Sequence, residues 1–202
     1  MPSETDLLND ALGQIGAARI TAIDDGSINA NHCQTFYPPL RDGALRAAKW
    51  NFTLKRVELA QDATGPEFEF AYSYTLPTDC LRVWEYYGAN PSTTTIPTAL
   101  VQSVAPWKIE GRKLVTNDAE VKILYGARLT NPDVWDALFY QYLTTHLASK
   151  LASAIPKDER KANSLLDQAI RVLLPMALAS DGQEGSVEPF VTDELLWGRT
   201  LA

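Results

Sequence analysis

GALRAAKW, residues 43–50, runs directly into NFTLKRVEL, residues 51–59, and this stretch decides the fold. The first half has apolar residues at helical spacing, and the second half has the composition of a β-strand. Trp50 and Phe52 lie at the joint, where no glycine, proline or polar run separates the two halves. Since each large aromatic ring buries about 150–250 Å², we expect Trp50 and Phe52 to form the core of a helix–β junction.

The wider pattern predicts an α+β protein in which a β domain is inserted between helices. We expect a four-helix bundle frame of two N-terminal and two C-terminal helices, an inserted antiparallel sheet or barrel-like domain, and an extended C-terminal tail. At 202 residues the chain suits one domain with an insertion, or two small domains. The predicted parts are a helical domain of residues 1–50 and 128–181, a β domain of residues 51–127 and a docking tail of residues 182–202.

Two helices are predicted in the N-terminal part, over about residues 4–15 and 27–48. Ser3 can cap the first helix, and Gly16 fits the left-handed position that ends a helix. The second helix contains Pro38 and Pro39. Because a proline removes a backbone hydrogen bond and clashes with the preceding turn, we expect a kink or a break there.

Two more helices are predicted after the β domain, over about residues 131–155 and 157–179. Asn131–Pro132 opens the first, with asparagine as the cap and proline at the first helical position, and Ile155–Pro156 ends it. Pro175 is expected to bend the second helix, and Asp181–Gly182 to end it. The apolar residues predicted to share one side of this last helix are Ala162, Leu165, Leu166, Ala169, Ile170, Leu173 and Ala177.

Strand patterns fill the region between these helices. Alternating polar and apolar residues predict strands over residues 51–60, 68–76, 80–87, 107–110, 113–116 and 121–125. The alternation slips near Lys55–Arg56, which predicts a bulge in the first strand. The run from Phe68 to Leu76 alternates most cleanly, and Gly111–Arg112 is expected to form the turn of a hairpin.

Two segments lack this periodicity. Gly88–Pro106 is longer than the roughly 12–15 residues of most loops in compact domains, and such loops tend to be functional or mobile. The C-terminal segment has five acids against one arginine when Asp181 is included. We expect this segment to become ordered on a partner, because it also carries isolated large apolar residues, namely Phe190, Leu195, Leu196 and Trp197.

Composition excludes several classes of protein. The formal net charge of −7 disfavours a protein that grips DNA or an anionic membrane, because such proteins use lysine and arginine to replace phosphate counterions. No run approaches the roughly 20 apolar residues of a membrane span, and the start of the chain does not resemble a signal peptide. We expect a soluble protein made in a reducing cytoplasm, with Cys33 and Cys80 as buried thiols rather than a disulfide.

Candidate catalytic and metal-binding residues are few and scattered. His32 and Cys33 are adjacent, so on a helix their side chains point about 100° apart and cannot share a metal ion. The second histidine, His146, belongs to another helix, and no pair of histidines or cysteines has zinc-site spacing. There is no Gly-x-Ser-x-Gly turn and no phosphate-binding glycine loop. Asp24–Asp25 and Asp158–Glu159 fit a turn and a helix start better than acid–base pairs. We therefore predict no catalytic, cofactor or metal site.

Four tyrosines could in principle form a stacking platform for nucleic acid. Tyr72, Tyr74, Tyr86 and Tyr87 all lie on predicted strands. Nucleic-acid platforms combine such rings with basic side chains, whereas these strands lack interleaved arginine and lysine and the whole chain is acidic. Packing in a core or an interface is the favoured interpretation.

Several ordered motifs resemble one protein family. The chain is similar to the head-to-tail adaptors of short-tailed bacteriophages, a family often called tail tubular protein A, over about nine-tenths of its length. The motifs that carry this resemblance are ALGQIG (11–16), the Ile23-Asp24-Asp25 that follows it, FYPPLRDGALRAAKWNF (36–52), YTLPTDCLRVWEYYG (74–88), WKIEGRKLVT (107–116), VWDALFYQYLTTHLASKLA (134–152) and ASDGQEG (179–185). Members of the family usually have an uninterrupted second helix, from which Pro38–Pro39 departs. The segment after Gly185 matches no part of the family pattern.

The resemblance implies a structural virion protein that is not an enzyme and needs no cofactor. Such adaptors form a ring, commonly of twelve copies, beneath the portal, carry the tail nozzle and continue the channel through which double-stranded DNA passes without specific binding. On this basis Phe190, Leu195, Leu196 and Trp197 are expected to dock on the portal or a neighbouring copy. The loop is expected to contact the next tail component through Asn90, Thr94, Ile96 and Leu100. The net acidity predicts a channel lined mostly by Asp and Glu.

Two other functions remain open at this point. A head-completion factor or tail assembly chaperone would share the fold but stay monomeric. A virion-associated hydrolase would need a pocket in which His32 or His146 meets an acid, because a Ser-His-Asp arrangement can be built from residues far apart in sequence.

Overall fold

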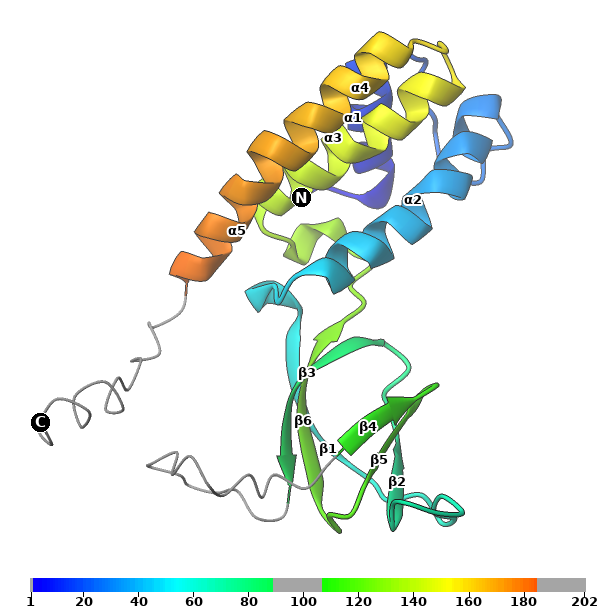
Figure 1. Ribbon diagram of the computed structural model, residues 1–202. Helices are drawn as coiled ribbons and strands as arrows, with labels where there is room; N and C mark the ends of the chain where they lie inside the picture. Colours follow the sequence, from blue (N-terminus) through cyan, green and yellow to red (C-terminus); the bar gives the residue numbers. More distant parts are fainter. Residues whose placement is uncertain (1, 89–106, 185–202) are drawn as a thin grey trace, which may run out of the picture.

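The computed structural model describes residues 2–88 and 107–184, and these have a mixed α+β architecture (Figure 1). The α-helices are α1 (Glu4–Ile15), α2 (Ile28–Ala47), α3 (Ala137–Ala154), α4 (Glu159–Gln168) and α5 (Leu174–Gln183). The strands are β1 (Leu54–Leu59), β2 (Tyr72–Thr75), β3 (Cys80–Gly88), β4 (Trp107–Glu110), β5 (Lys113–Thr116) and β6 (Val121–Ala127). Two short 3₁₀ turns are η1 (Asn51–Thr53) and η2 (Pro132–Val134), and a π-helical segment, η3 (Ala169–Leu173), joins α4 to α5.

Helix α3 lies at the centre of the helical part. It packs against α1, α2, α4 and α5, and Figure 1 shows α4 and α5 running along it as one rod. Ten of its 18 residues are buried, as expected for a helix that is covered on several sides. The buried side chains of the helices merge into one cluster, which we call the helical core; Phe139, Leu143 and Leu147 lie in it without any exposed surface.

The predicted ends of the first helix are confirmed. Ser3 Oγ accepts a hydrogen bond from the Asp6 amide at 3.1 Å, while the Asp6 carboxylate accepts one from the Ser3 amide at 2.9 Å. This reciprocal capping box satisfies two amides that the helix itself leaves unpaired. Gly16 ends the helix with a φ of 73°, a left-handed conformation that favours glycine.

A kink or a break was predicted in the second helix, and the break is wrong. Helix α2 continues through Pro38 and Pro39. The two prolines are adjacent, so the missing amide donors fall on one turn. Residues on both sides of that turn are buried, among them Cys33, Tyr37 and Ala44. Burial of the flanking turns thus stabilises the helical conformation across the gap in hydrogen bonding.

The predicted boundaries of the C-terminal helices also need correction. Asn131 caps the short η2 turn, and α3 begins only at Ala137, where the Asp136 carboxylate accepts hydrogen bonds from two backbone amides. Pro175 has no amide hydrogen to continue the α-helical pattern, and the π-helical segment lies directly before it. Asp181 and Gly182 lie within α5 rather than ending it.

The β part consists of two antiparallel three-stranded sheets. Sheet A has the strand order β1-β6-β3, and sheet B has the order β2-β5-β4. Because β1 follows η1 and β6 leads back towards α3, the chain enters and leaves the β part through two paired neighbouring strands (Figure 1). An insertion closed in this way leaves the helices on both sides of it free to pack together.

The position of the predicted bulge is wrong. Strand β1 pairs with β6 in continuous register from Leu54 to Leu59, and the register shifts lie in β3 instead, between Cys80 and Arg82 and between Val83 and Glu85. The slip of alternation has a different cause: Phe52 belongs to the η1 turn and not to the strand.

The run with the cleanest alternation forms only a short strand. Of residues 68–76, only Tyr72–Thr75 are in β2. Glu69 has a φ of 69°, which interrupts the extended chain, and Phe68 is 79% exposed. The hairpin of β4 and β5 is confirmed, with Gly111 at a φ of 61° in its turn.

A second and smaller cluster, the β core, lies in the β part. It contains residues such as Leu59, Tyr74, Leu114 and Ile123, and Leu129 packs against both this cluster and the helical core. Cys33 and Cys80 are both free and buried, as predicted, and burial raises the pKa of the Cys33 thiol to about 11. Among the described helices, none combines the length and apolar character needed to cross a membrane.

Candidate docking surfaces

The aromatic residues predicted at the junction lie in the helical core. Trp50 is fully buried, and its ring meets Phe139 edge-on at 4.9 Å between centroids. Its Nε1 donates a hydrogen bond to the Ala44 carbonyl at 3.0 Å. Phe52 is partly buried against the same cluster, with its centroid 5.1 Å from that of Phe139. These two rings therefore fix the end of α2 and the η1 turn to α3.

The remaining predicted contact residues lie outside the described part of the chain. This holds for the tail residues Phe190, Leu195, Leu196 and Trp197, and for the loop residues Asn90, Thr94, Ile96 and Leu100. Their roles stay predictions. The described residues do form other exposed surfaces, namely the faces of the sheets and the outer faces of the helices.

Polar contacts connect the helical part to the β part. Lys49, just after α2, forms an ion pair with Glu85 of β3. Asp42 of α2 forms an ion pair of 2.8 Å with Arg128, which directly follows β6. Both pairs cross from the second helix to sheet A, so they orient the sheet relative to the helices.

A buried carboxyl group adds a third link at the junction. Asp181 of α5 is 7% exposed, and its Oδ1 accepts a hydrogen bond from the Asn51 amide at 2.8 Å. The Asn51 side-chain amide donates to the Asp181 carbonyl at 2.6 Å. Burial raises the pKa of Asp181, against the opposing effect of the hydrogen bond from Asn51. The end of α5 is thereby fastened to the start of the η1 turn.

Sheet A presents a face with rows of charged side chains. The register places Glu58, Lys122 and Tyr87 side by side on β1, β6 and β3. The next row contains Arg56, Leu124 and Glu85, in which Leu124 is 2% exposed. Each row thus carries one acidic and one basic side chain, and opposite charges on neighbouring strands contribute favourably to a sheet.

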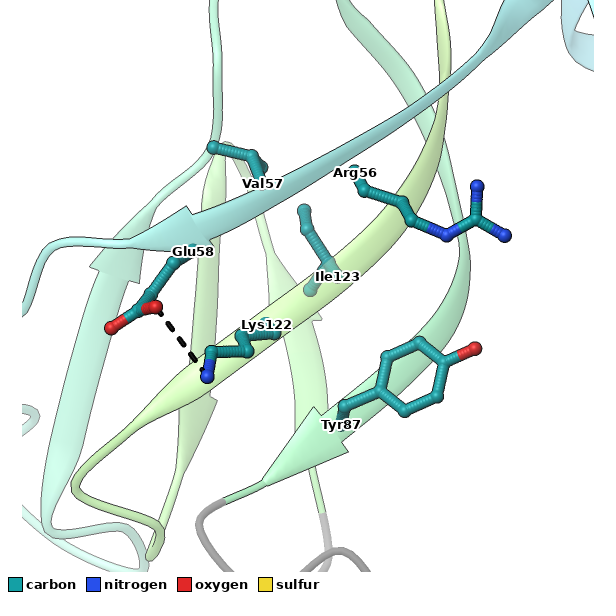
Figure 2. A pocket seen from close by; sticks show the side chains of 6 residues that line it. All are labelled: Arg56, Val57, Glu58, Tyr87, Lys122 and Ile123. Atoms are coloured by element: carbon teal, nitrogen blue, oxygen red, sulfur yellow. Dashed lines mark ion pairs between the residues drawn. The ribbon is translucent and has the colours of Figure 1, made fainter.

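One end of this face forms a shallow pocket of about 490 Å³, which we call the sheet pocket; it is lined by Arg56, Val57, Glu58, Tyr87, Lys122 and Ile123. Figure 2 shows the Glu58–Lys122 ion pair on one side of it and the side chains of Arg56 and Tyr87 together on the other. Tyr87 is 43% exposed and directly precedes the loop Gly88–Pro106, which is predicted to contact a tail component. An open pocket with a charged rim is suited to docking a protein surface.

The last helix carries an exposed apolar surface. Four of the nine large hydrophobic residues that are exposed in the described chain lie between residues 170 and 178, namely Ile170, Val172, Met176 and Leu178. We call this set the α5 patch. Ile170 was expected on the buried side of the helix but is 45% exposed. It lies within the π-helical segment, where side chains point in other directions than regular α-helical spacing predicts. Val172 and Met176 are four positions apart and so share one side of this rod, where neighbouring exposed apolar side chains make a candidate interaction surface.

The histidines have neighbours other than acids. His32 stacks on Phe36, with 6.2 Å between ring centroids, and His146 Nδ1 lies 3.3 Å from the Tyr142 hydroxyl. Burial lowers the pKa of His146. Within residues 2–88 and 107–184 neither histidine forms a hydrogen bond or an ion pair with a carboxylate, and no group of three His, Cys, Asp or Glu residues is placed to hold a metal ion.

Most of the predicted tyrosine set packs inside the β part. Tyr74 is 1% exposed, and Tyr86 stacks on Trp107 of the other sheet at 5.6 Å with an interplanar angle of 15°. The Tyr86 hydroxyl donates to Asp118 Oδ2 at 2.5 Å, which connects the two sheets further. Core packing accounts for these rings, and Tyr87 is the one that reaches the sheet pocket.

Sequence patterns gave no direct indication of the two docking surfaces. The α5 patch could be found only by noting that apolar residues occur on more than one side of the last helix, from Ile170 to Leu178. The sheet pocket depends on register, since Glu58 and Lys122 are 64 positions apart in the sequence and become neighbours only when β1 pairs with β6. Comparison with known proteins found no protein-family model that matches the chain and no curated protein with significant sequence similarity.

Proposed function

We propose that this chain is a structural subunit of a head-to-tail adaptor ring in a short-tailed bacteriophage. In this proposal about twelve copies assemble beneath the portal, hold the tail nozzle and continue the channel for double-stranded DNA. The subunit acts by binding neighbours in the virion and catalyses no reaction. It is made in the host cytoplasm and needs no cofactor. The sequence motifs between Ala11 and Gly185 that resemble the adaptor family are the starting point for this proposal.

The α5 patch is the observation that carries the proposal. A subunit of a closed ring presents two different lateral surfaces, each complementary to the other. The exposed apolar residues of this patch, Ile170 and Val172 on η3 and Met176 and Leu178 on α5, fit such lateral contacts with neighbouring copies. In this view the helices α1, α2, α3 and the α4–α5 rod act as a four-helix bundle frame that holds the patch rigidly.

The position of the sheet pocket supports contacts along the axis of the ring. The helices and the β sheets occupy opposite ends of the described molecule (Figure 1). We propose that the sheet pocket and the following segment, residues 89–106, contact the nozzle component, while the C-terminal segment docks within the ring or on the portal. The net charge of −7 suits a channel in which DNA moves without adhering.

Substitution within the α5 patch tests the proposal. The double variant Val172→Asp/Met176→Asp places two charges at positions that are 50% and 49% exposed, so the monomer should keep its fold while the lateral contact is lost. Wild-type protein mixed with purified portal is expected to form rings in negative-stain electron microscopy and to sediment as one large complex. The double variant should remain unassembled or bind as scattered subunits.

The matched control is Ser164→Asp, which adds a charge to an exposed position of α4 away from the patch and should assemble normally. Circular dichroism of all variants confirms that the helices are intact. Rings of normal composition from the double variant would contradict the assignment of the patch. A wild-type protein that stays monomeric even with portal would contradict the adaptor function and favour an assembly chaperone.

A further inference from the structure

A pocket at the junction of the helical and β parts collects three arginines. Its volume is about 240 Å³, and it lies between the end of α2, the start of β3 and the turn of the β4–β5 hairpin. We call it the arginine pocket. It is lined by Arg46, Arg82 and Arg112 together with the apolar residues Leu81, Val83 and Ile109, among others.

Within residues 2–88 and 107–184 the three guanidinium groups have no carboxylate within ion-pair distance. Arg46 donates a hydrogen bond to the Leu81 carbonyl, Arg112 donates one to the Pro77 carbonyl, and the Arg82 guanidinium lies 4.2 Å from the centroid of the Trp84 ring. None of the three forms an ion pair with a carboxylate in the described part of the chain. The chain as a whole has 25 acidic against 18 basic side chains, so three unpaired arginines around one pocket are a marked local excess of positive charge.

The fixed positions of these arginines favour an anionic ligand that can accept two parallel hydrogen bonds, such as a carboxylate or a phosphate. Carbonyl oxygens hold two of the side chains in place while leaving other N–H groups available, and a guanidinium binds a carboxylate or phosphate through parallel hydrogen bonds. The apolar part of the lining decides between these two anions. Ile109 is 42% exposed, and together with Leu81 and Val83 it offers a surface that a phosphate backbone would not cover but an acidic, apolar peptide would.

We propose that the arginine pocket binds the acidic C-terminal segment, residues 185–202, of a second copy of this chain. The inference rests on the proposed ring, in which copies lie side by side. The segment has the required chemistry, since its sequence GSVEPFVTDELLWGRTLA contains both acids (Glu188, Asp193 and Glu194) and large apolar residues. It follows α5 directly, and 18 residues of extended chain reach up to roughly 60 Å. That reach is sufficient to cross to a neighbouring subunit.

A labelled peptide of residues 185–202 tests this binding directly by fluorescence anisotropy. The receptor is the full-length chain with E188Q, D193N and E194Q, so that its own segment does not compete. Saturable binding is expected. The double variant Arg46→Gln/Arg112→Gln should weaken binding at least about tenfold, because charge-assisted hydrogen bonds to the carboxylates are lost. Arg160→Gln removes an exposed arginine of α4 that lies outside the pocket, and it serves as the matched control with unchanged binding.

A charge exchange guards against misfolding of the variants. Arg112→Glu should abolish binding of the natural peptide, and a peptide with E188K, D193K and E194K should bind this variant better than the wild-type receptor. Equal peptide affinity for the wild-type receptor and the Arg46→Gln/Arg112→Gln variant would overturn the proposal. So would tighter binding of a short DNA duplex than of the peptide at the same salt concentration, which would assign the pocket to nucleic acid.

Assembly is measured separately on the same proteins. If rings form with the portal but the arginine substitutions do not change peptide binding, this inference is refuted and the adaptor function stands. If peptide binding depends on the arginines but no ring forms, the adaptor function is refuted and the peptide site stands.

Discussion

The helical part and the β part of this molecule are stabilised in different ways. The helical core contains 23 buried hydrophobic residues and the β core only nine. In contrast, five of the eight ion pairs in the described chain include a residue between Asn51 and Ala127. Exposed ion pairs each contribute only about 0–1 kcal/mol, whereas burial of a large apolar side chain contributes about 1.5–3 kcal/mol. We therefore expect a robust helical part joined to a β part whose stability depends more on pH and salt.

The largest effect is expected from the centre of the frame. Phe139 is fully buried, and its ring meets those of Trp50, Phe52 and Trp135. Phe139→Ala removes a ring from a close-packed cluster and should lower the free energy of unfolding by about 3–5 kcal/mol. Urea unfolding followed by far-UV circular dichroism measures this loss.

The matched control for this change is Phe68→Ala in the β part. Phe68 is 79% exposed, so its removal should change the free energy of unfolding by less than about 0.5 kcal/mol. Comparable losses for the two variants would show that the helical core is not the main source of stability.

A smaller effect is expected where the two sheets meet. The Tyr86 hydroxyl donates to the Asp118 carboxylate and lies 3.0 Å from the Thr116 hydroxyl, and burial raises the pKa of Tyr86. Tyr86→Phe keeps the stacking on Trp107 but removes a hydrogen bond to a charged group, at a cost of about 1.5–3 kcal/mol. Hydrogen exchange should show the loss of protection in β3 and β5 and little change in α3. Equal deprotection of α3 would mean that the two parts unfold as one unit.

The contrast between the two parts also explains which features the sequence could predict. Helix α1 was predictable to the residue, because its signals, from the Ser3 cap to the Gly16 stop, are local. The β4–β5 hairpin was predictable for the same reason. Phe68 and Phe70 both fit a strand pattern. Because Glu69 between them has a positive φ, Phe68 is exposed and Phe70 is buried. No local signal encodes that difference.

The docking surfaces were less predictable because they depend on contacts between distant segments. Asp181 looked like the end of a helix, and its role became clear only from Asn51, which lies 130 positions earlier. The three arginines of the arginine pocket come from α2, β3 and the hairpin turn, so their convergence requires the full topology. The α5 patch was hidden by the π-helical turn, which moved Ile170 off the expected side.

Acid pH should weaken the β part through Asp62. Its carboxylate accepts hydrogen bonds from Ser73 and Thr75 and pairs with Lys113 at 2.9 Å. These contacts, with the hydrogen bond from Lys113 as the largest, lower the pKa of Asp62 from 3.8 to about 2. Because the pKa is lower in the folded state, the ionised Asp62 stabilises the fold at pH values above 3.8, its pKa in the unfolded state. This contribution disappears as the pH falls towards 2.

Asp62→Asn should remove this pH dependence at a cost of about 1 kcal/mol at pH 7. Urea unfolding of the β part at pH 7, 4 and 2.5 measures both effects, with the wild type converging on the variant at the lowest pH. Glu58→Gln, which alters an ion pair of 3.5 Å between two exposed side chains, is the control and should change little. A wild-type protein whose stability stayed constant down to pH 2.5 would contradict the assignment.

The smallest effect, and one of opposite sign, is expected at Asp181 in the helical part. Because burial raises its pKa, the folded state binds the proton more tightly than the unfolded state does. The resulting stabilisation is present in full at pH values below 3.8, the pKa of the unfolded state. It is lost as the pH rises through the pKa of the folded state. At pH 7 the ionised carboxylate therefore carries a cost that an amide would not.

Asp181→Asn keeps an oxygen that can accept the 2.8 Å hydrogen bond from the Asn51 amide while removing the charge. The free energy of unfolding at pH 7 should rise slightly or stay within about 1 kcal/mol of the wild type. Asp181→Ala is the informative comparison, because it removes the hydrogen bond between the Asn51 amide and the Asp181 side chain and should cost about 1–3 kcal/mol. If Asp181→Asn proved as damaging as Asp181→Ala, the charge itself would be stabilising the junction. The helical part would then depend on electrostatics in the same way as the β part, and the distinction between the two would fail at the point where they meet.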